Sequence, residues 1–106
     1  METKIDNAVI TFSRWDREGC LTHWLGIDGD GWGCGFGGYC LKGEACSMWI
    51  EALMETLEIY ELSDKILIGK IVRVEHEGLG GGIVAIGHPV KNKWMRPKEL
   101  FSKFKI

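Results

Sequence analysis

Four glycines recur at every second residue near the middle of the chain, and this spacing restricts the fold more than any other feature. They are Gly31, Gly33, Gly35 and Gly37. Residues two apart point to the same face of an extended chain, so this segment is predicted to be a strand with one face of bare backbone. Bare backbone lets a ligand, an aromatic ring or another chain approach closely, although glycine loses more entropy on ordering than other residues.

The same segment satisfies a dinucleotide-binding pattern, G-x-G-x-x-G, over Gly33-Cys-Gly35-Phe-Gly37-Gly38. That motif should lead directly into a helix, whereas Tyr39-Cys-Leu41 intervenes and is predicted to continue the strand. We therefore reject a Rossmann site. Two alternatives stay open: the glycine backbone cradles a planar or phosphorylated ligand beside Trp32, Phe36 and Tyr39, or the glycines form a tight bend or permit close packing.

Hydrophobic patterning predicts the rest of the fold. Ala8–Trp15 and Cys20–Ile27 alternate apolar and polar residues and should form a hairpin. Residues 44–60 have apolar side chains at helical spacing and predict the main helix, which lies on a sheet. The β-rich stretch Ile66–His76 and the strand Ile83–Ile86 flank a glycine-rich turn and predict a second hairpin.

The expected fold class is therefore α+β, with an antiparallel sheet of two hairpins packed against one main helix at about residues 44–60. Residues 97–104 are expected to add a short C-terminal helix with proline in its first turn. A chain of 106 residues that is 45% hydrophobic and 26% charged should fold as a single domain over residues 1–106.

The sequence disfavours both a membrane-spanning protein and a metal-binding protein. No apolar run approaches the roughly 20 residues that cross a bilayer, and the N-terminus lacks a signal-peptide pattern, so a cytoplasmic protein is expected. In that reducing compartment the four cysteines, Cys20, Cys34, Cys40 and Cys46, should be free thiols. Cys20 and His23 have a C-x-x-H spacing, but a matching second pair is missing, so neither zinc nor another cofactor is expected.

His88 is the histidine best placed for function, because Lys91, Lys93 and Trp94 follow it at the end of a predicted strand. This group is predicted to hold a phosphate or an acidic partner. Residues 91–106 have six basic side chains against one acidic and carry +5; the net charge of −2 therefore leaves −7 on residues 1–90. The basic end can contact phosphates, pair with the acidic body of the same chain or a neighbour, or remain solvated.

The sequence does not show a set of residues that could carry out catalysis. His23 falls on the apolar face of its strand and is interpreted as a core histidine. No nucleophile–base pair or close carboxylate pair is visible, so a non-enzymatic protein is favoured. The chain has five tryptophans, of which Trp15, Trp32 and Trp94 lie at predicted element ends. Their rings either roof a small core or anchor an interface, which would make a homo-oligomer.

Two stretches together carry a family resemblance. Leu21-Thr-His-Trp-Leu-Gly-Ile-Asp28 leads to Gly35-Phe-Gly-Gly-Tyr39, and Gly69-Lys-Ile-Val-Arg-Val74 leads to Ile86-Gly-His88 and Lys93-Trp94. In this order they resemble a family of small phage and prophage proteins of unassigned function, over about residues 10–94. That family has a Gly-Gln-Gly-Phe type element where this chain has Gly33-Cys-Gly35-Phe36, and it generally lacks these cysteines. The resemblance implies an accessory role in a mobile element, with antagonism of host defence as the expected activity.

The leading functional hypothesis is a non-enzymatic phage-type binding protein or inhibitor in the cytoplasm of a bacterial host. It would sequester a nucleotide-like small molecule, or block a host protein, through the glycine-rich surface. The alternative is a nucleic-acid-binding accessory protein that uses the basic C-terminal tail, and a third hypothesis is a hydrolase of a nucleotide signal that uses His88. The predicted ligand- or partner-binding residues are Trp32, Gly33, Gly35, Phe36, Gly37, Gly38, Tyr39, His88, Lys91, Lys93 and Trp94.

Overall fold

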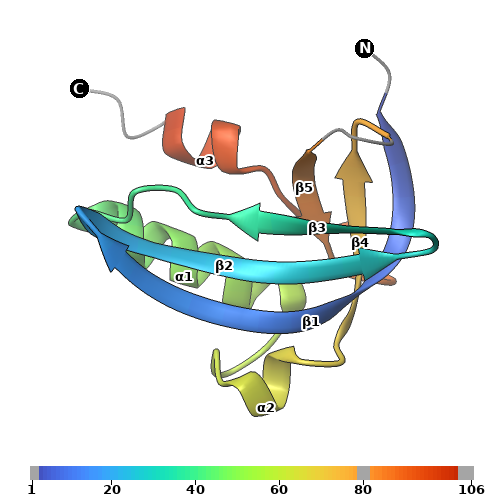
Figure 1. The fold of residues 1–106 in the computed structure, drawn as a ribbon, viewed down its shortest axis with the longest axis horizontal. Helices are drawn as coiled ribbons and strands as arrows, with labels where there is room; N and C mark the ends of the chain where they lie inside the picture. Colours follow the sequence, from blue (N-terminus) through green and yellow to red (C-terminus); the bar gives the residue numbers. More distant parts are fainter. Residues whose placement is uncertain (1–2, 79–81, 103–106) are drawn as a thin grey trace.

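The protein is described by a computed structural model that covers residues 3–78 and 82–102 (Figure 1). Within those residues, six strands form an antiparallel sheet in the order β3-β2-β1-β4-β5-β6. The strands are β1 (Lys4–Glu18), β2 (Cys20–Gly29), β3 (Trp32–Gly37), β4 (Ile71–His76), β5 (Ile83–Gly87) and β6 (Trp94–Met95). The helices are α1 (Glu44–Leu57), α2 (Asp64–Leu67) and α3 (Pro97–Ser102). The predicted α+β class, with an antiparallel sheet and one main helix, is confirmed.

Strand β1 joins the two predicted hairpins into one sheet. Its first half, Lys4–Val9, pairs with β4, and its second half, Val9–Glu18, pairs with β2. The register shifts between Ile10 and Phe12, where a β-bulge bends the strand and increases its twist. In Figure 1 the blue strand accordingly runs down beside β4 and then sweeps across beneath β2. The sheet is therefore strongly curved, with a concave face.

Helix α1 packs against this concave face and forms the core with it. Its buried side chains Trp49, Leu53 and Leu57 follow helical spacing, as predicted from the sequence. They pack in one cluster with buried residues of β1, β2, β3 and β4, which include Ile10, Leu25, Ile27, Phe36, Val72 and Val74. This burial of apolar surface between helix and sheet is the main stabilising contribution to the fold.

Helix α1 ends three residues earlier than predicted. Glu58 adopts the left-handed conformation, with φ 55° and ψ 50°. The N–H of Ile59 then donates to the carbonyl of Met54 at 3.0 Å, which is the Schellman arrangement that closes a helix. Glycine usually occupies such a position, so a glutamate there gave no stop signal in the sequence. Tyr60 consequently lies outside the helix and is 97% exposed.

Several strand boundaries also differ from the prediction. Strand β1 begins at Lys4 and ends at Glu18, whereas Ala8–Trp15 was predicted. Residues 64–67 form the short helix α2, so the predicted strand from Ile66 begins only at Ile71. Tyr39–Leu41 does not continue β3 as a strand. Helix α3 is described over Pro97–Ser102, and the predicted residues 103–104 lie outside the described part. In the described ranges, no helix is long and apolar enough to cross a membrane.

On the convex face of the sheet, three glycines lie beneath aromatic rings of neighbouring strands. The ring of Trp24 on β2 lies over Gly35 and Gly38, and the ring of Phe12 on β1 lies over Gly26. A methyl group at Gly26 or Gly38 would overlap these rings, and one at Gly35 would lie 3.3 Å from Trp24 Cε3. Phe12 and Gly26 are direct cross-strand partners, as are Gly26 and Gly35. The glycines thus leave room for aromatic rings of the same chain.

We predict that Gly26→Ala lowers the free energy of unfolding by about 1–3 kcal/mol, because the added methyl group displaces the Phe12 ring. Urea denaturation measures this change. Gly82→Ala is the matched control, because its methyl group meets nothing within 4 Å; it should change stability by no more than about 1 kcal/mol. In a Phe12→Ala background the penalty at Gly26 should disappear. Equal stability of wild type and Gly26→Ala would contradict the packing described.

Candidate functional site

A cavity of about 680 Å³ opens where the β2–β3 turn approaches the start of β1. In Figure 1 that turn reaches the right-hand side of the molecule, beside the first half of β1. The volume falls in the range of small-molecule sites. Its walls come from β1, the β2–β3 turn, β3 and the end of β4, and its chemically distinctive side chains are Lys4, Asp6, Asp30, Trp32, Cys34 and His76.

A histidine–carboxylate pair forms one wall of the cavity. The His76 side chain is 8% exposed, and its Nε2 lies 2.6 Å from Asp6 Oδ2. The N–H of Gly78 donates to His76 Nδ1 at 3.2 Å. Because Nδ1 accepts this bond, Nε2 carries a ring proton and donates it to Asp6. Both ring nitrogens are therefore engaged in bonds within the protein, and His76 orients the Asp6 carboxylate.

Trp32 forms the aromatic wall. Its ring packs against the His76 ring, with centroids 4.7 Å apart. It also covers its cross-strand partner Gly29, where a methyl group would overlap the indole. The nearby Cys34 thiol is free and donates to the carbonyl of Gly35 at 3.4 Å. The cavity thus combines an aromatic ring with the carboxylates of Asp6 and Asp30.

The predicted glycine-rich surface is divided by the fold. Trp32 and Gly33 line the cavity, whereas Gly35 and Gly38 lie under the Trp24 ring. Gly37 has a φ of 117°, and a methyl group there would overlap the carbonyl of His23. Such a conformation and such an approach both require glycine. The first two residues of the predicted surface therefore reach the cavity, and the other glycines pack against their own chain.

The two remaining aromatic residues of that segment belong to the interior. Phe36 is 2% exposed and stacks on Trp49, with centroids 5.6 Å apart. Tyr39 packs against Trp49 and Phe101, at centroid distances of 5.8 and 5.3 Å. Burial raises the pKa of the Tyr39 hydroxyl. These rings support α1 and α3 and do not line the cavity.

The predicted cluster around His88 binds an acidic group of its own chain. Lys91 Nζ and Lys93 Nζ both lie 2.8 Å from Glu58 Oε2, and His88 Nε2 lies 3.5 Å from Glu58 Oε1. Hydrogen bonds from Lys91 and then from Lys93 lower the pKa of Glu58 to about 2. The guanidinium of Arg73 donates to the carbonyls of His88 and Lys91, at 2.8 and 2.7 Å. The loop after β5 is thereby held on the end of α1.

The half-buried Trp94 ring packs against neighbours of its own chain. Its ring lies over Gly87, where a methyl group would come within 2.7 Å of Trp94 Cε3. The guanidinium carbons of Arg73 and Arg96 lie 5.0 and 5.7 Å from the centre of the ring. Arg96 also pairs with Glu75 at 2.8 Å. Of the predicted cation–aromatic group, the structure brings His88, Lys91 and Lys93 onto Glu58 and places Trp94 in this separate stack.

His23 is fully buried, which confirms its interpretation as a core histidine. The Trp49 indole N–H donates to His23 Nδ1 at 2.9 Å, so the ring proton is on Nε2, which is 2.8 Å from Ser13 Oγ. Trp15 stacks on the imidazole, with centroids 4.1 Å apart. Burial lowers the pKa of His23 to about 4 and keeps the ring neutral at neutral pH.

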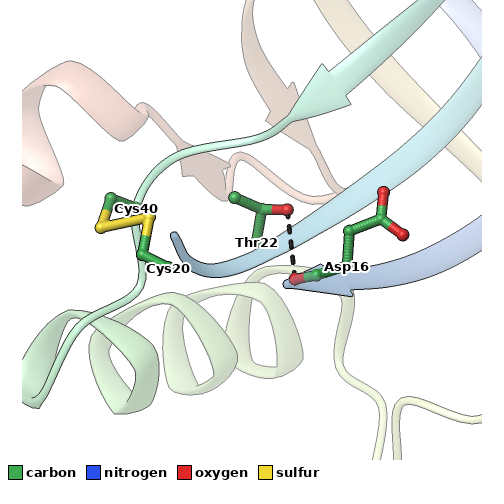
Figure 2. The surroundings of a disulfide bond; sticks show 4 residues. All are labelled: Asp16, Cys20, Thr22 and Cys40. Atoms are coloured by element: carbon green, nitrogen blue, oxygen red, sulfur yellow. Dashed lines mark hydrogen bonds between the residues drawn. A yellow bond between two sulfur atoms is a disulfide. The ribbon is translucent and has the colours of Figure 1, made fainter. Parts of the chain in front are cut away.

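A disulfide joins Cys20 at the start of β2 to Cys40 in the segment after β3 (Figure 2). The two Cα atoms are 5.6 Å apart, which is normal for a disulfide. Thr22 donates to the carbonyl of Asp16 at 3.4 Å close by. The expectation of four free thiols is therefore wrong for this pair, whereas Cys34 and Cys46 are free. Across the described residues, no group of three or more His, Cys, Asp and Glu side chains could hold a metal ion.

Local sequence patterns indicated little of the cavity. Asp6 and His76 are 70 residues apart and meet only because β1 and β4 pair antiparallel. Asp30 lies in a stretch whose composition indicated only a turn. Comparison of the chain with protein-family models, curated proteins and solved structures finds no match.

We predict that the free energy of unfolding falls by about 3 kcal/mol as the pH drops from 6.5 to 4, because of His23. The unfolded chain binds the proton near pH 6.5, whereas the folded ring has a pKa of about 4. The stabilising contribution of unprotonated His23 is therefore complete above pH 6.5 and is lost as the pH falls from 6.5 to 4. Urea denaturation at several pH values measures it, and NMR should show the Nε2–H tautomer of His23. Protonation of folded His23 near pH 6.5 would contradict this.

We predict that Glu58→Gln increases binding to single-stranded DNA, because it frees Lys91 and Lys93 for phosphates. Each additional phosphate contact should steepen the slope of log K against log salt by about 0.7. Fluorescence anisotropy with a labelled oligonucleotide measures this, and Glu51→Gln on the exposed side of α1 is the charge-matched control. Tight binding by wild type that Glu58→Gln leaves unchanged would show that these lysines are not sequestered.

Proposed function

We propose that this protein is a non-enzymatic binding protein that sequesters a nucleotide-like small molecule in the cavity beside Trp32. The observation that carries the proposal is the cavity itself, of about 680 Å³, with Trp32 on one side and the carboxylate of Asp6 on another. An indole stacks on planar rings, and carboxylates accept hydrogen bonds from amino and imino groups. A heterocyclic ligand with such donors matches both walls.

The histidines support binding rather than turnover. His23 and His76 each use both ring nitrogens in bonds within the protein. His88 Nδ1 accepts the N–H groups of Val90 and Lys91, at 3.1 and 2.9 Å, and its Nε2 faces Glu58. A general base needs a free lone pair near the substrate. The hydrolase hypothesis based on His88 therefore loses its main support.

The biological setting is proposed from the resemblance to small phage and prophage proteins. Sequestration of a nucleotide-like signal in the cytoplasm of a bacterial host would counter a defence that depends on that signal. The structure has a disulfide between Cys20 and Cys40, whereas such a compartment keeps most thiols reduced. The structure places no part of the cavity on this pair, so ligand binding would not depend on its redox state.

A second candidate function, blockade of a host protein, is supported by apolar side chains on the surface. Ile5, Phe12 and Ile71 are 57%, 44% and 57% exposed and belong to the paired strands β1 and β4. Such residues on a sheet face suit a protein contact, either with a host protein or with a second copy of this chain. The nucleic-acid alternative has less support, because Lys91 and Lys93 bind Glu58 and Arg96 binds Glu75.

We predict that nucleosides or nucleotides stabilise the protein and that Asp30→Asn weakens this effect. A ligand at 100 times its Kd should add about 2.7 kcal/mol to the free energy of unfolding, which thermal denaturation detects as a clear rise in Tm. Asp30 is exposed, so its substitution should leave the Tm of the free protein unchanged. Asp28→Asn is the matched control, because Asp28 is also exposed but does not line the cavity.

The proposal is abandoned if no common nucleoside, nucleotide or cyclic dinucleotide shifts the Tm. Binding that Asp30→Asn and Asp28→Asn affect equally would place the ligand elsewhere on the protein. The second candidate function has a separate test, in which Ile5→Ser and Ile71→Ser are combined in one variant. If that variant still retains a host protein that wild type binds, the apolar surface is not the partner site.

A further inference from the structure

We infer that the cavity takes the base of its ligand and disfavours phosphate groups, so that it binds nucleosides more tightly than their polyphosphates. This inference rests on the proposed function and specifies which part of a nucleotide-like ligand lies beside Trp32. It reverses the usual reading of a glycine-rich segment as a phosphate cradle. Three features of the described residues support this inference. They are the charges that line the cavity, the hydrogen bonds that backbone N–H groups already make, and the position of the carboxylates.

The charges that line the cavity are mainly negative. Asp6 and Asp30 contribute two carboxylates, and Lys4 contributes one ammonium group. His76 Nδ1 accepts the Gly78 N–H and its Nε2 is bound to Asp6, so neither ring nitrogen is open to a phosphate. A triphosphate brought against this surface would be repelled at short range, where screening by salt is weak.

Two backbone donors of the glycine segment and the cavity rim are already used within the protein. The N–H of Gly38 donates to the carbonyl of His23 at 2.9 Å. The N–H of Gly78, which borders the cavity, is bound to His76 Nδ1. Phosphate sites in proteins use several converging N–H groups or an arginine or lysine cluster, and among the described residues this cavity has Lys4 as its only lysine or arginine.

The same walls suit a base that carries amino groups. His76 Nε2 fixes Asp6 at 2.6 Å and so holds a carboxylate in the cavity wall in a set orientation. A carboxylate can accept two parallel N–H groups, which guanine presents as its ring N–H and adjacent amino group. Trp32 lies on the same cavity and can stack on the purine. Guanosine is therefore the probe that best matches these side chains.

The test compares guanosine, guanosine monophosphate and guanosine triphosphate by isothermal titration calorimetry at low salt, with the full-length protein. We expect guanosine to bind at least tenfold more tightly than the triphosphate, with the monophosphate between them. Added salt should narrow the difference, because it screens the repulsion. Asp30→Asn should weaken guanosine binding and strengthen triphosphate binding, so the two affinities move in opposite directions. Glu51→Gln, which removes one charge on the exposed side of α1 and outside the cavity lining, should change neither.

The possible failures are distinguishable. If affinity increases with the number of phosphates, the inference is overturned while the proposed function stands. If no nucleoside or nucleotide binds at millimolar concentration, the proposed function fails and the inference fails with it. If inosine, which lacks the amino group of guanosine, binds as tightly as guanosine, the assignment of the base edge to the carboxylates is wrong.

Discussion

Aromatic rings that lie across glycines of neighbouring strands hold the convex face of this sheet together. Phe12 covers Gly26, Trp24 covers Gly35 and Gly38, and each of these glycines leaves the space that a methyl group would occupy. Helix α1 fills the concave face, so the convex face is covered by side chains of the strands themselves. These three glycines are therefore structural partners of aromatic residues, and the cavity lies at one end of the curved sheet, beside the start of β1.

Two regions of the molecule differ in the charge of their side chains: the loop after β5 is basic, and the cavity is lined mainly by carboxylates. The basic side chains after β5 converge on Glu58, which stands in a left-handed conformation at the end of α1 and closes a loop that is distant in sequence. At the cavity, by contrast, two carboxylates and one lysine line the wall, and His76 orients one of the carboxylates. The basic residues that look suited to phosphates in the sequence are thus paired within the chain, whereas the cavity has mainly hydrogen-bond acceptors on its charged side chains.

The elements that local patterning predicted well are those whose energetics are local. The helical spacing of Trp49, Leu53 and Leu57 identified α1. Alternation in β1 and β2, and the β-rich composition of β4 and β5 around a glycine-rich turn, identified the two hairpins. The errors lie where a tertiary contact overrides a local preference. A glutamate occupies a glycine-type position at the end of α1, where its carboxylate binds Lys91 and Lys93. The apolar residues at Ile66–Leu67 form a helical turn, where Leu67 is buried, although their composition favours a strand.

The sequence by itself determined that the segment with a glycine at every second residue is strand-like, which the structure shows for Trp32–Gly37. It also determined that other groups approach the backbone of this segment closely, and that His23 lies in the core. Only the tertiary structure decided what lies against those glycines, because the Trp24 and Phe12 rings reach them across strand pairs whose register no local pattern specifies. The same holds for the cavity. Asp6 and His76 acquire their pairing from the antiparallel register of β1 and β4, and Trp32 joins them because the curved sheet brings β3 near the end of β4.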